Sequence, residues 1–251
     1  MAKLIILGSS NAIPDEKHEN THMAVVGDKH IVLIDCVSNP ILRLPQAGIE
    51  FNALTDLILT HFHPDHVSGV PLLLMNMWLL GRKNPLNIYG LHHTLTRIED
   101  LMGFYAWENW PNFFPVVFHR LPQEEMTQVL DNDEFRIIAS PVQHMVPTIG
   151  LRLESLQSHM SIAYSCDTEP CAQVVRLANR VDYLIHEATG TGFGHSSAAQ
   201  AGEIASEAGV RRLYLIHYQT RDFDPRVLIG EAQDKFQGEV CLAEDFMRIE
   251  F

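Results

Sequence analysis

The spacing of apolar residues predicts many short strands and a few helices along the whole chain. Runs of three or four mostly apolar residues, bounded by Gly, Asn, Asp or Pro, are typical of strands buried in a sheet. The predicted strands lie at 4–7, 24–26, 31–34, 57–59, 87–89, 151–153, 162–164, 183–185 and 213–216, with further strand character over 134–147. The runs 24–26 and 31–34 flank Gly27-Asp28-Lys29, which predicts a hairpin.

Three segments with a helical pattern are marked by their ends. Residues 72–80 follow Pro71 and stop at Gly81, residues 94–105 form an amphipathic stretch, and residues 196–209 are rich in Ala and stop at Gly209. Proline is favoured in the first turn of a helix, and glycine is favoured just beyond the last turn. Ser196 is the expected N-cap of the third helix.

Strands and helices alternate in both halves of the chain, and no Pro/Gly/Ser-rich linker divides them. The pattern therefore predicts a single α/β domain over residues 1–251, with two sheets covered on the outside by helices. A chain of 251 residues is long enough to bury a large core.

The composition, 46% hydrophobic and 20% charged, is that of a soluble globular protein. The longest apolar stretch, 70–80, is shorter than the roughly 20 residues that cross a bilayer, and the N-terminus lacks a signal-peptide pattern. The four cysteines form no Cys-x-x-Cys pair, so neither a disulfide framework nor a thiolate zinc site is expected. These features predict a cytoplasmic protein with no membrane partner. The net charge of −13 argues against general polyanion binding, which needs clustered Lys and Arg.

The most informative segment is Thr60–His66, which carries four metal-ligand side chains directly after a predicted buried strand. On an extended chain His61 and His63 project to the same side, and the following turn can bring Asp65 and His66 to a second position. Imidazoles and carboxylates suit zinc and other borderline divalent ions. A histidine-rich surface loop is the alternative, but further ligand types downstream argue against it.

The segment HFHPDHVSGVPLLL (61–74) closely resembles the His-x-His-x-Asp-His signature of metallo-β-lactamase-fold hydrolases. Its continuation, with Gly69, Pro71, Gly81-Arg82 and residues 85–90, is similar to the ribonuclease Z branch of that family, and the resemblance covers nearly the whole chain. It implies a four-layer αββα sandwich. It also implies a hydrolase with two divalent ions, Zn²⁺ first, with Mn²⁺ or Fe²⁺ as alternatives.

The resemblance also implies which residues hold the ions. One ion would lie on His61, His63 and His144, and the other on Asp65, His66 and His217. Asp167 would be shared, and a hydroxide between the ions would attack the substrate. Asp35, at the end of a predicted strand, would orient the ligands from behind.

Two further motifs match the ribonuclease Z branch, namely His186–Thr189 and Gly194–Ser197. The match implies that His195 stabilises or protonates the leaving oxygen, for which a side chain of near-neutral pKa is suited. Glu187 would orient a neighbouring side chain, with a purely structural salt bridge as the alternative. Arg221 matches an arginine in the family's terminal motif and could meet an anionic substrate, although a surface arginine needs no such role.

The other histidines have no ligand-like spacing and receive no role. His18 and His22 are expected in a solvated polar loop, and Cys166 is expected to be a small buried residue rather than a ligand.

Two departures bear on the substrate. Ribonuclease Z carries a long protruding arm that binds transfer RNA, and the arm is inserted in the chain between the third metal histidine and the bridging aspartate. In this chain only 22 residues separate the corresponding His144 and Asp167. The Gly-Glu-Gly-Thr pattern expected after Cys36 is replaced by residues 37–40 (Val-Ser-Asn-Pro). With the acidic balance, these departures argue against transfer-RNA maturation.

The favoured function is hydrolysis of a phosphodiester, either RNA or a small nucleotide ester, by a ribonuclease Z-like mechanism. Hydrolysis of a carboxylic ester or lactone on the same site is an alternative, because the same hydroxide attacks carbonyl groups. A non-catalytic metal-binding module is a further alternative, against which the intact ligand set argues. Family members often pair, so the resemblance also implies a homodimer.

Overall fold

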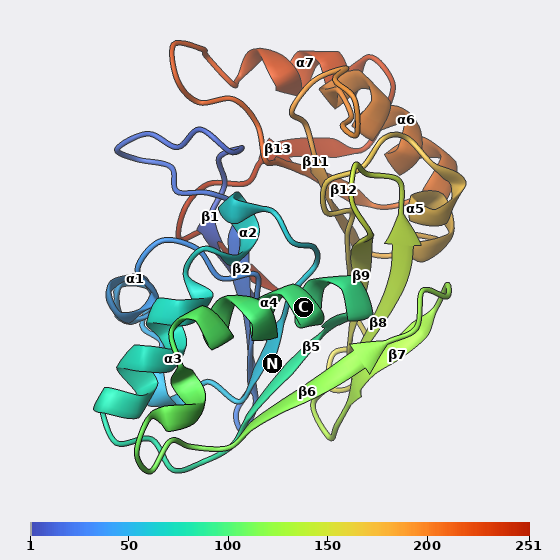
Figure 1. Ribbon diagram of the computed structural model, residues 1–251. Coiled ribbons are helices and arrows are strands. Elements are labelled where there is room, and N and C mark those ends of the chain that lie inside the picture. The colour runs from blue at the N-terminus through green and yellow to red at the C-terminus, as the bar shows by residue number, and fades with distance from the viewer. Residues whose placement is uncertain (1) are drawn as a thin grey trace.

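The computed structural model describes residues 2–251, which form two seven-stranded mixed sheets with helices on their outer sides (Figure 1). In the first sheet the strands at the β14 side run antiparallel to their neighbours, and β3 to β6 run parallel. Its strands in spatial order are β14 (Arg248–Glu250), β1 (Lys3–Gly8), β2 (His22–Val26), β3 (Ile31–Ile34), β4 (Asp56–Ile58), β5 (Leu86–Leu91) and β6 (Val116–Leu121).

The second sheet has the same mixed character. Strands β10 to β13 run parallel, while β7 to β10 form an antiparallel meander. In spatial order they are β13 (Glu239–Leu242), β12 (Arg212–Ile216), β11 (Tyr183–Glu187), β10 (Ser161–Tyr164), β9 (Thr148–Ser155), β8 (Phe135–Val142) and β7 (Thr127–Asp131).

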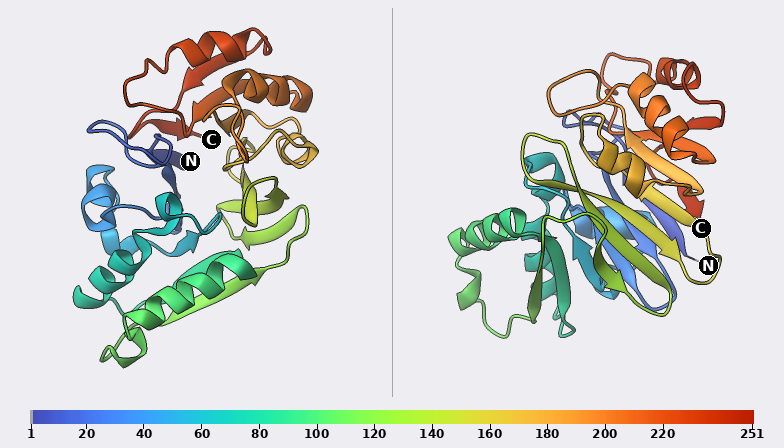
Figure 2. Two further views of the ribbon diagram at one scale, coloured as in Figure 1. Left: turned by 45° about the horizontal axis from the view of Figure 1, so that its top comes forward. Right: turned by 90° about the vertical axis from the view of Figure 1, so that its right-hand side faces the viewer.

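Three hydrophobic clusters separate four layers. Because strand side chains alternate between the faces of a sheet, Leu4 and Ile6 point into the core shared by both sheets, while Ile5 and Leu7 join a second cluster under the helices. The second sheet is built in the same way, with its outer face in a third cluster. Helices α1 (Pro40–Gln46), α3 (Val70–Leu79) and α4 (His92–Phe104) cover the first sheet, and α5 (Ala172–Leu177), α6 (Ala198–Ala208) and α7 (Val227–Gln233) cover the second (Figure 2).

The predicted four-layer αββα sandwich is therefore confirmed. The predicted third helix is α6, but its N-cap is Ser197, whose hydroxyl accepts the Gln200 N–H in a reciprocal capping box. The expectation for Ser196 was wrong because its hydroxyl donates instead to the Thr168 carbonyl oxygen. Among residues 2–251, no helix is both long and apolar enough to span a membrane.

His22 is a correction to the sequence analysis, because it lies in β2 and is buried rather than solvated. Its Nδ1 atom lies 2.8 Å from the carbonyl oxygen of Asn20, to which it donates. Burial lowers the pKa of His22 to about 4.

Acidification should therefore destabilise the fold through His22. The His22 ring takes up a proton near pH 4 in the folded protein, but near pH 6.5 in the unfolded chain. The stability that neutral His22 contributes is therefore fully present above pH 6.5 and is lost as the pH falls toward 4. In the metal-free protein, His22→Asn should reduce the loss of unfolding free energy between pH 7 and pH 4 by roughly 3 kcal/mol. Urea unfolding at both pH values measures this difference. The matched control is His159→Asn at an exposed turn, and an identical pH dependence for both variants would contradict the assignment.

Candidate metal centre

The candidate site is assembled from residues that follow the ends of strands in both sheets. Asp35 follows β3, His61 and His63 follow β4, and His144 follows β8. A short helix, α2 (Pro64–Val67), carries Asp65 and His66. The carboxyl ends of parallel strands lie at one edge of a sheet, so these segments converge there.

The remaining two ligand candidates, Asp167 and His217, follow β10 and β12. Three residues at these strand ends have left-handed backbone angles: Asp35 (φ 59°), Cys166 (φ 56°) and His217 (φ 54°). Such angles cost about 1–3 kcal/mol each in a non-glycine residue and concentrate at functional sites. Backbone strain at the carboxyl-terminal edge of the sheets is therefore tolerated at residues that position the candidate ligands.

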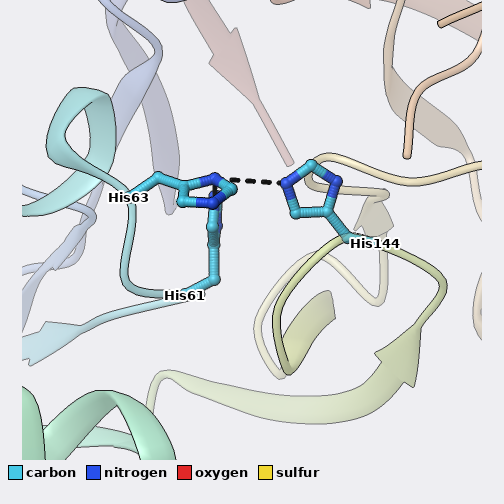
Figure 3. A group of neighbouring side chains, drawn as sticks. All are labelled: His61, His63 and His144. Atoms are coloured by element: carbon cyan, nitrogen blue, oxygen red, sulfur yellow. Dashed lines mark hydrogen bonds between the residues drawn. The ribbon is translucent and has the colours of Figure 1, made fainter. Parts of the chain in front are cut away.

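His61, His63 and His144 form the first group. The Nε2 atom of His61 lies 3.1 Å from Nδ1 of His63, and Nε2 of His144 lies 3.2 Å from the same Nδ1 (Figure 3). The three nitrogen atoms thus face one another from two different sheets. Three converging imidazoles are a ligand set suited to a divalent ion.

Asp65, His66, Asp167 and His217 form the second group, with all four ligand atoms within 4.8 Å of one another. Oδ2 of Asp167 lies 3.5 Å from Nε2 of His66 and 3.4 Å from Nε2 of His217. Oδ2 of Asp65 lies 3.8 Å and 3.5 Å from the same two nitrogens. Asp167 also lies within 4.8 Å of the His144 ligand atom, so it stands between the two groups.

Buried polar atoms without partners test whether this site fits metal ions. Among the described residues, His66 Nε2, His217 Nε2 and Asp167 Oδ1 are buried and accept or donate no hydrogen bond. An unpaired buried polar atom costs about 1–3 kcal/mol, and a bound ion is one explanation for it. All three atoms belong to the second group, and the nitrogen and oxygen donors there fit a divalent cation.

Hydrogen bonds behind the ligands select the tautomers that can bind metal. His66 donates from Nδ1 to Oδ2 of Asp35 at 2.8 Å. The Thr60 hydroxyl donates to the same carboxylate at 2.7 Å and accepts from Nδ1 of His61 at 3.1 Å. Asp35 therefore orients one histidine directly and one through Thr60. Assigned from these partners, both rings keep the Nε2 lone pair free for a metal.

His217 and His144 are held in the same way by residues of the loop that follows β11. His217 donates from Nδ1 to the Thr189 hydroxyl at 2.8 Å, and that hydroxyl donates to the His217 carbonyl oxygen. His144 donates from Nδ1 to the Gly194 carbonyl oxygen at 2.7 Å. Sequence reasoning missed Thr60, Thr189 and Gly194 as supports, although all three lie inside the motifs that it quoted.

Charge differs between the two groups. Burial lowers the pKa of His61, His63 and His144, so these imidazoles are neutral and available as ligands. In the second group burial opposes a charge on His66, but the carboxylates of Asp167 and Asp35 raise the pKa of His66 well above its usual value. Carboxylates dominate that group, and a divalent cation would balance them.

The model of a family described as "Beta-lactamase superfamily domain" matches residues 30–218, which is most of the chain. The chain belongs to the β-lactamase superfamily. The matched residues include Asp35 and all seven ligand candidates of this chain.

Relatives and solved structures agree with this placement. Ribonuclease Z of Methanothermobacter thermautotrophicus is 28% identical, with 100% of this chain and 97% of the relative covered. The metallo-beta-lactamase fold protein YhfI from Bacillus subtilis superposes with a TM-score of 0.83 at 22% identity, covering 100% and 99% of the two chains. The short form of human tRNase Z superposes with a TM-score of 0.78 at 23% identity, covering 99% and 98%. At these identities the two structures establish the fold.

In this superfamily member, Glu187 and His195 form a pair beside the two groups. Glu187 is buried at the end of β11, and its Oε1 accepts from Nδ1 of His195 at 2.9 Å. The His195 ring centroid lies 5.1 Å from that of His144 and 5.8 Å from that of His217. Burial opposes a charge on His195, but the hydrogen bond that His195 donates to Glu187 raises the pKa of His195 above its usual value.

Glu187 makes further contacts besides the pair with His195. Its carboxylate accepts the backbone N–H groups of Thr168, Thr189 and Ser196 at 2.9 to 3.1 Å. These bonds tie together the segments that carry Asp167 and His195.

The role of Arg221 at an anionic substrate stays a prediction. Arg221 is exposed, and its carbonyl oxygen accepts a hydrogen bond from the Gln219 side chain. Cys166 is fully buried, with Sγ 3.6 Å from Nδ1 of His61, and burial raises the pKa of its thiol well above the usual value. It lies behind the ring and fills space there.

Proposed function

We propose that the chain is a dinuclear metal-dependent hydrolase that cleaves a phosphodiester. The observation that carries the proposal is the arrangement of seven ligand side chains in two groups, with Asp167 between them and His195 beside both. The 28% identity to a ribonuclease Z over the full chain supports a phosphodiester as the substrate class. Since His61 and His63 come from one sheet and His144 from the other, the site needs both sheets. This supports the proposal that the chain works as one domain.

Each ligand group has a role in this proposal. His61, His63 and His144 would hold one ion, and Asp65, His66 and His217 the other, with Asp167 shared. Two ions bound there would supply a hydroxide nucleophile at neutral pH and stabilise negative charge on the phosphoryl group. Zinc, and pairing of two chains as a homodimer, stay predictions from the resemblance.

Asp65 is the proposed acceptor for a proton of the attacking water. Its side chain is 16% exposed, compared with 0% and 2% for His66 and Asp167, so it lies on the solvent side of its group. Burial opposes its ionisation, but His217 and His66 outweigh burial and lower the pKa of Asp65 below its ordinary value. The carboxylate is therefore ionised near neutral pH, which a proton acceptor requires.

His195 is the proposed proton donor to the leaving oxygen. Its Nδ1–H is fixed on Glu187, which leaves Nε2 as the only ring nitrogen available to the reaction. The negative charge of Glu187 stabilises the protonated ring, so His195 can enter the reaction as an acid.

The proposed substrate is smaller than a precursor transfer RNA. The segment between His144 and Asp167 is taken up by β9, β10 and short turns, so it holds no protruding arm. The alignment with the archaeal ribonuclease Z runs over 306 positions, at least 55 more than the 251 residues of this chain. The relative therefore carries insertions that this chain lacks.

A substrate panel tests the proposal. The zinc- or manganese-loaded protein should bind two metal equivalents per chain and hydrolyse bis-p-nitrophenyl phosphate, and chelation should abolish the activity. A lactone panel and a precursor transfer RNA should be turned over much more slowly. Preference for the lactones would replace the phosphodiester with a carbonyl substrate. Full metal occupancy without turnover of any substrate would favour a binding module, and transfer-RNA 3′ cleavage would overturn the proposed substrate size.

A further inference from the structure

One exposed aromatic residue lies in the loop just before Gly194 and His195 and has no role in the chemistry described above. The residue is Phe193, which is 79% exposed. It belongs to the loop between β11 and α6, which can be followed in Figure 1. Gly194, the next residue, holds His144 through its carbonyl oxygen, and His195 follows. Consecutive Cα atoms are about 3.8 Å apart, so the Phe193 backbone lies within roughly 8 Å of the proposed proton donor.

The base of this loop is fixed, although its tip is exposed. The Gly190 N–H donates to the Ser196 carbonyl oxygen, which closes the loop, and the Gly194 N–H donates to Oε1 of Glu169. A side chain at Gly194 would come within 2.8 Å of Nδ1 of His144, so the close approach requires glycine. The loop therefore presents Phe193 from a defined anchor rather than from a free chain end.

A second apolar side chain lies against the same loop. Met145, half exposed, packs with its Cγ atom over Gly194. Phe193 and Met145 thus flank the segment that orients His144, and we call them the apolar lip of the site. Aromatic and methionine side chains left open beside a catalytic centre are suited to contact a flat apolar group.

The groove that continues from Met145 has no charged lining residue, and the Glu169 carboxylate beside the loop accepts hydrogen bonds from the Gly194 N–H and from the Gln143 side chain. A groove of about 440 Å³ runs beside His144 and Met145, and its polar lining comes from Gln123, Gln143 and Gln173. No Lys or Arg lines this groove. Amide side chains pair with the edges of nucleobases, whereas a phosphate would need cationic partners.

We propose that the apolar lip binds the nucleobase of a nucleoside phosphodiester, with Phe193 stacking on the base while the phosphate lies at the metal centre. The proposal rests on the proposed phosphodiester function and adds the nature of the ester group. It divides the substrate by chemistry: the anionic phosphate goes to the histidine and aspartate groups, and the neutral heteroaromatic base goes to the lip and the glutamines. Phe193 would then determine affinity for base-bearing esters without taking part in bond cleavage.

Equilibrium binding tests the proposal independently of turnover. In titration calorimetry with the manganese-loaded protein, Phe193→Ala should raise the Kd for thymidine 5′-monophosphate about tenfold, the scale of one lost base–aromatic stack. The Kd for methyl phosphate, which has no base, should stay within about twofold. Phe193→Trp should restore nucleotide binding, and Phe193→Leu should restore only part of it.

The chain offers a matched control in Phe104, which is 85% exposed at the end of α4. Helix α4 is 13 residues long and starts beside the strand ends, so Phe104 lies roughly 20 Å along the helix from that edge. Phe104→Ala should leave both dissociation constants unchanged. Equal losses for both ligands in Phe193→Ala, or no loss for the nucleotide, would overturn the proposal.

Hydrolysis rates of two esters test the proposed phosphodiester function separately from base binding. Binding of a short RNA then shows whether the base belongs to a small nucleotide or to a polynucleotide. Thymidine 5′-(p-nitrophenyl phosphate) and methyl p-nitrophenyl phosphate both add water at phosphorus and release p-nitrophenolate. If the protein hydrolyses neither ester, the proposed phosphodiester function is contradicted, but the measured effect of Phe193 on nucleotide binding still stands. Dependence on Phe193 for thymidine 5′-monophosphate alone identifies a small nucleotide ester, whereas an equal loss for a ten-nucleotide RNA identifies the end of a polynucleotide.

Discussion

Replacing Asp65 with alanine should lower kcat for bis-p-nitrophenyl phosphate by a factor of about a thousand or more, and the protein should stay folded. Two functions would be lost together. The Asp65 carboxylate is one ligand of the second group, 3.5 Å from Nε2 of His217, and it is also the proposed acceptor for the proton of the attacking water. Because the side chain is partly exposed and lies on the short α2 helix, its removal leaves no buried cavity.

Metal content and circular dichroism must accompany this kinetic measurement. We expect native secondary structure and fewer than two metal equivalents per chain in Asp65→Ala. Asp100→Ala, on the exposed surface of α4, is the matched control and should behave as wild type. Unchanged turnover in a folded Asp65→Ala protein would rule out the proposed mechanism.

Replacing His195 with alanine should slow hydrolysis by about a hundredfold for substrates with poor leaving groups. An alkoxide needs a proton as its bond to phosphorus breaks, whereas p-nitrophenolate leaves without one. The loss should therefore be much smaller for p-nitrophenyl esters, and a plot of log kcat against the pKa of the leaving group should become steeper in the variant.

Glu187→Gln tests the partner of His195 without emptying the buried position. The amide oxygen of glutamine can keep the bonds that Oε1 accepts from the backbone N–H groups of Thr168 and Ser196, but glutamine removes the charge that stabilises protonated His195. We expect a smaller loss than in His195→Ala, with the same dependence on the leaving group. An equal loss across all leaving groups in both variants would show that the pair maintains the loop and does not deliver a proton.

The sequence was most informative where strands are buried on both faces. Interior strands such as β4 and β12 appear as short continuous apolar runs, because each face packs against a hydrophobic layer. Four strands were missed, and they are the edge strands of the two sheets: β6, β7, β13 and β14. Edge strands are partly exposed, so charged and polar residues break the run that reveals a strand.

The helices show the same limit. The predicted helices carry clear end signals, such as Pro71 and Gly209, and they were found within a few residues of their observed ends. Helices α1, α5 and α7 have only six or seven residues, too short to display a helical period. They form because they cover a sheet face, and that requirement comes from tertiary packing.

The sequence by itself determined the alternation of strands and helices and the cluster of candidate ligands at His61–His66, because both are local patterns. The resemblance to metallo-β-lactamase-fold hydrolases implied the order of the layers and the distant candidates His144, Asp167 and His217. Only the tertiary structure decided which atoms face one another. It placed His144 from one sheet against His63 from the other, and it put Asp167 between the two groups. It also decided which tautomers the histidines adopt, through partners such as Asp35 for His66 and Gly194 for His144, which lie 31 and 50 residues away along the chain. Such contacts depend on how two sheets pack at a common edge, and a one-dimensional pattern carries no information about distances between distant segments.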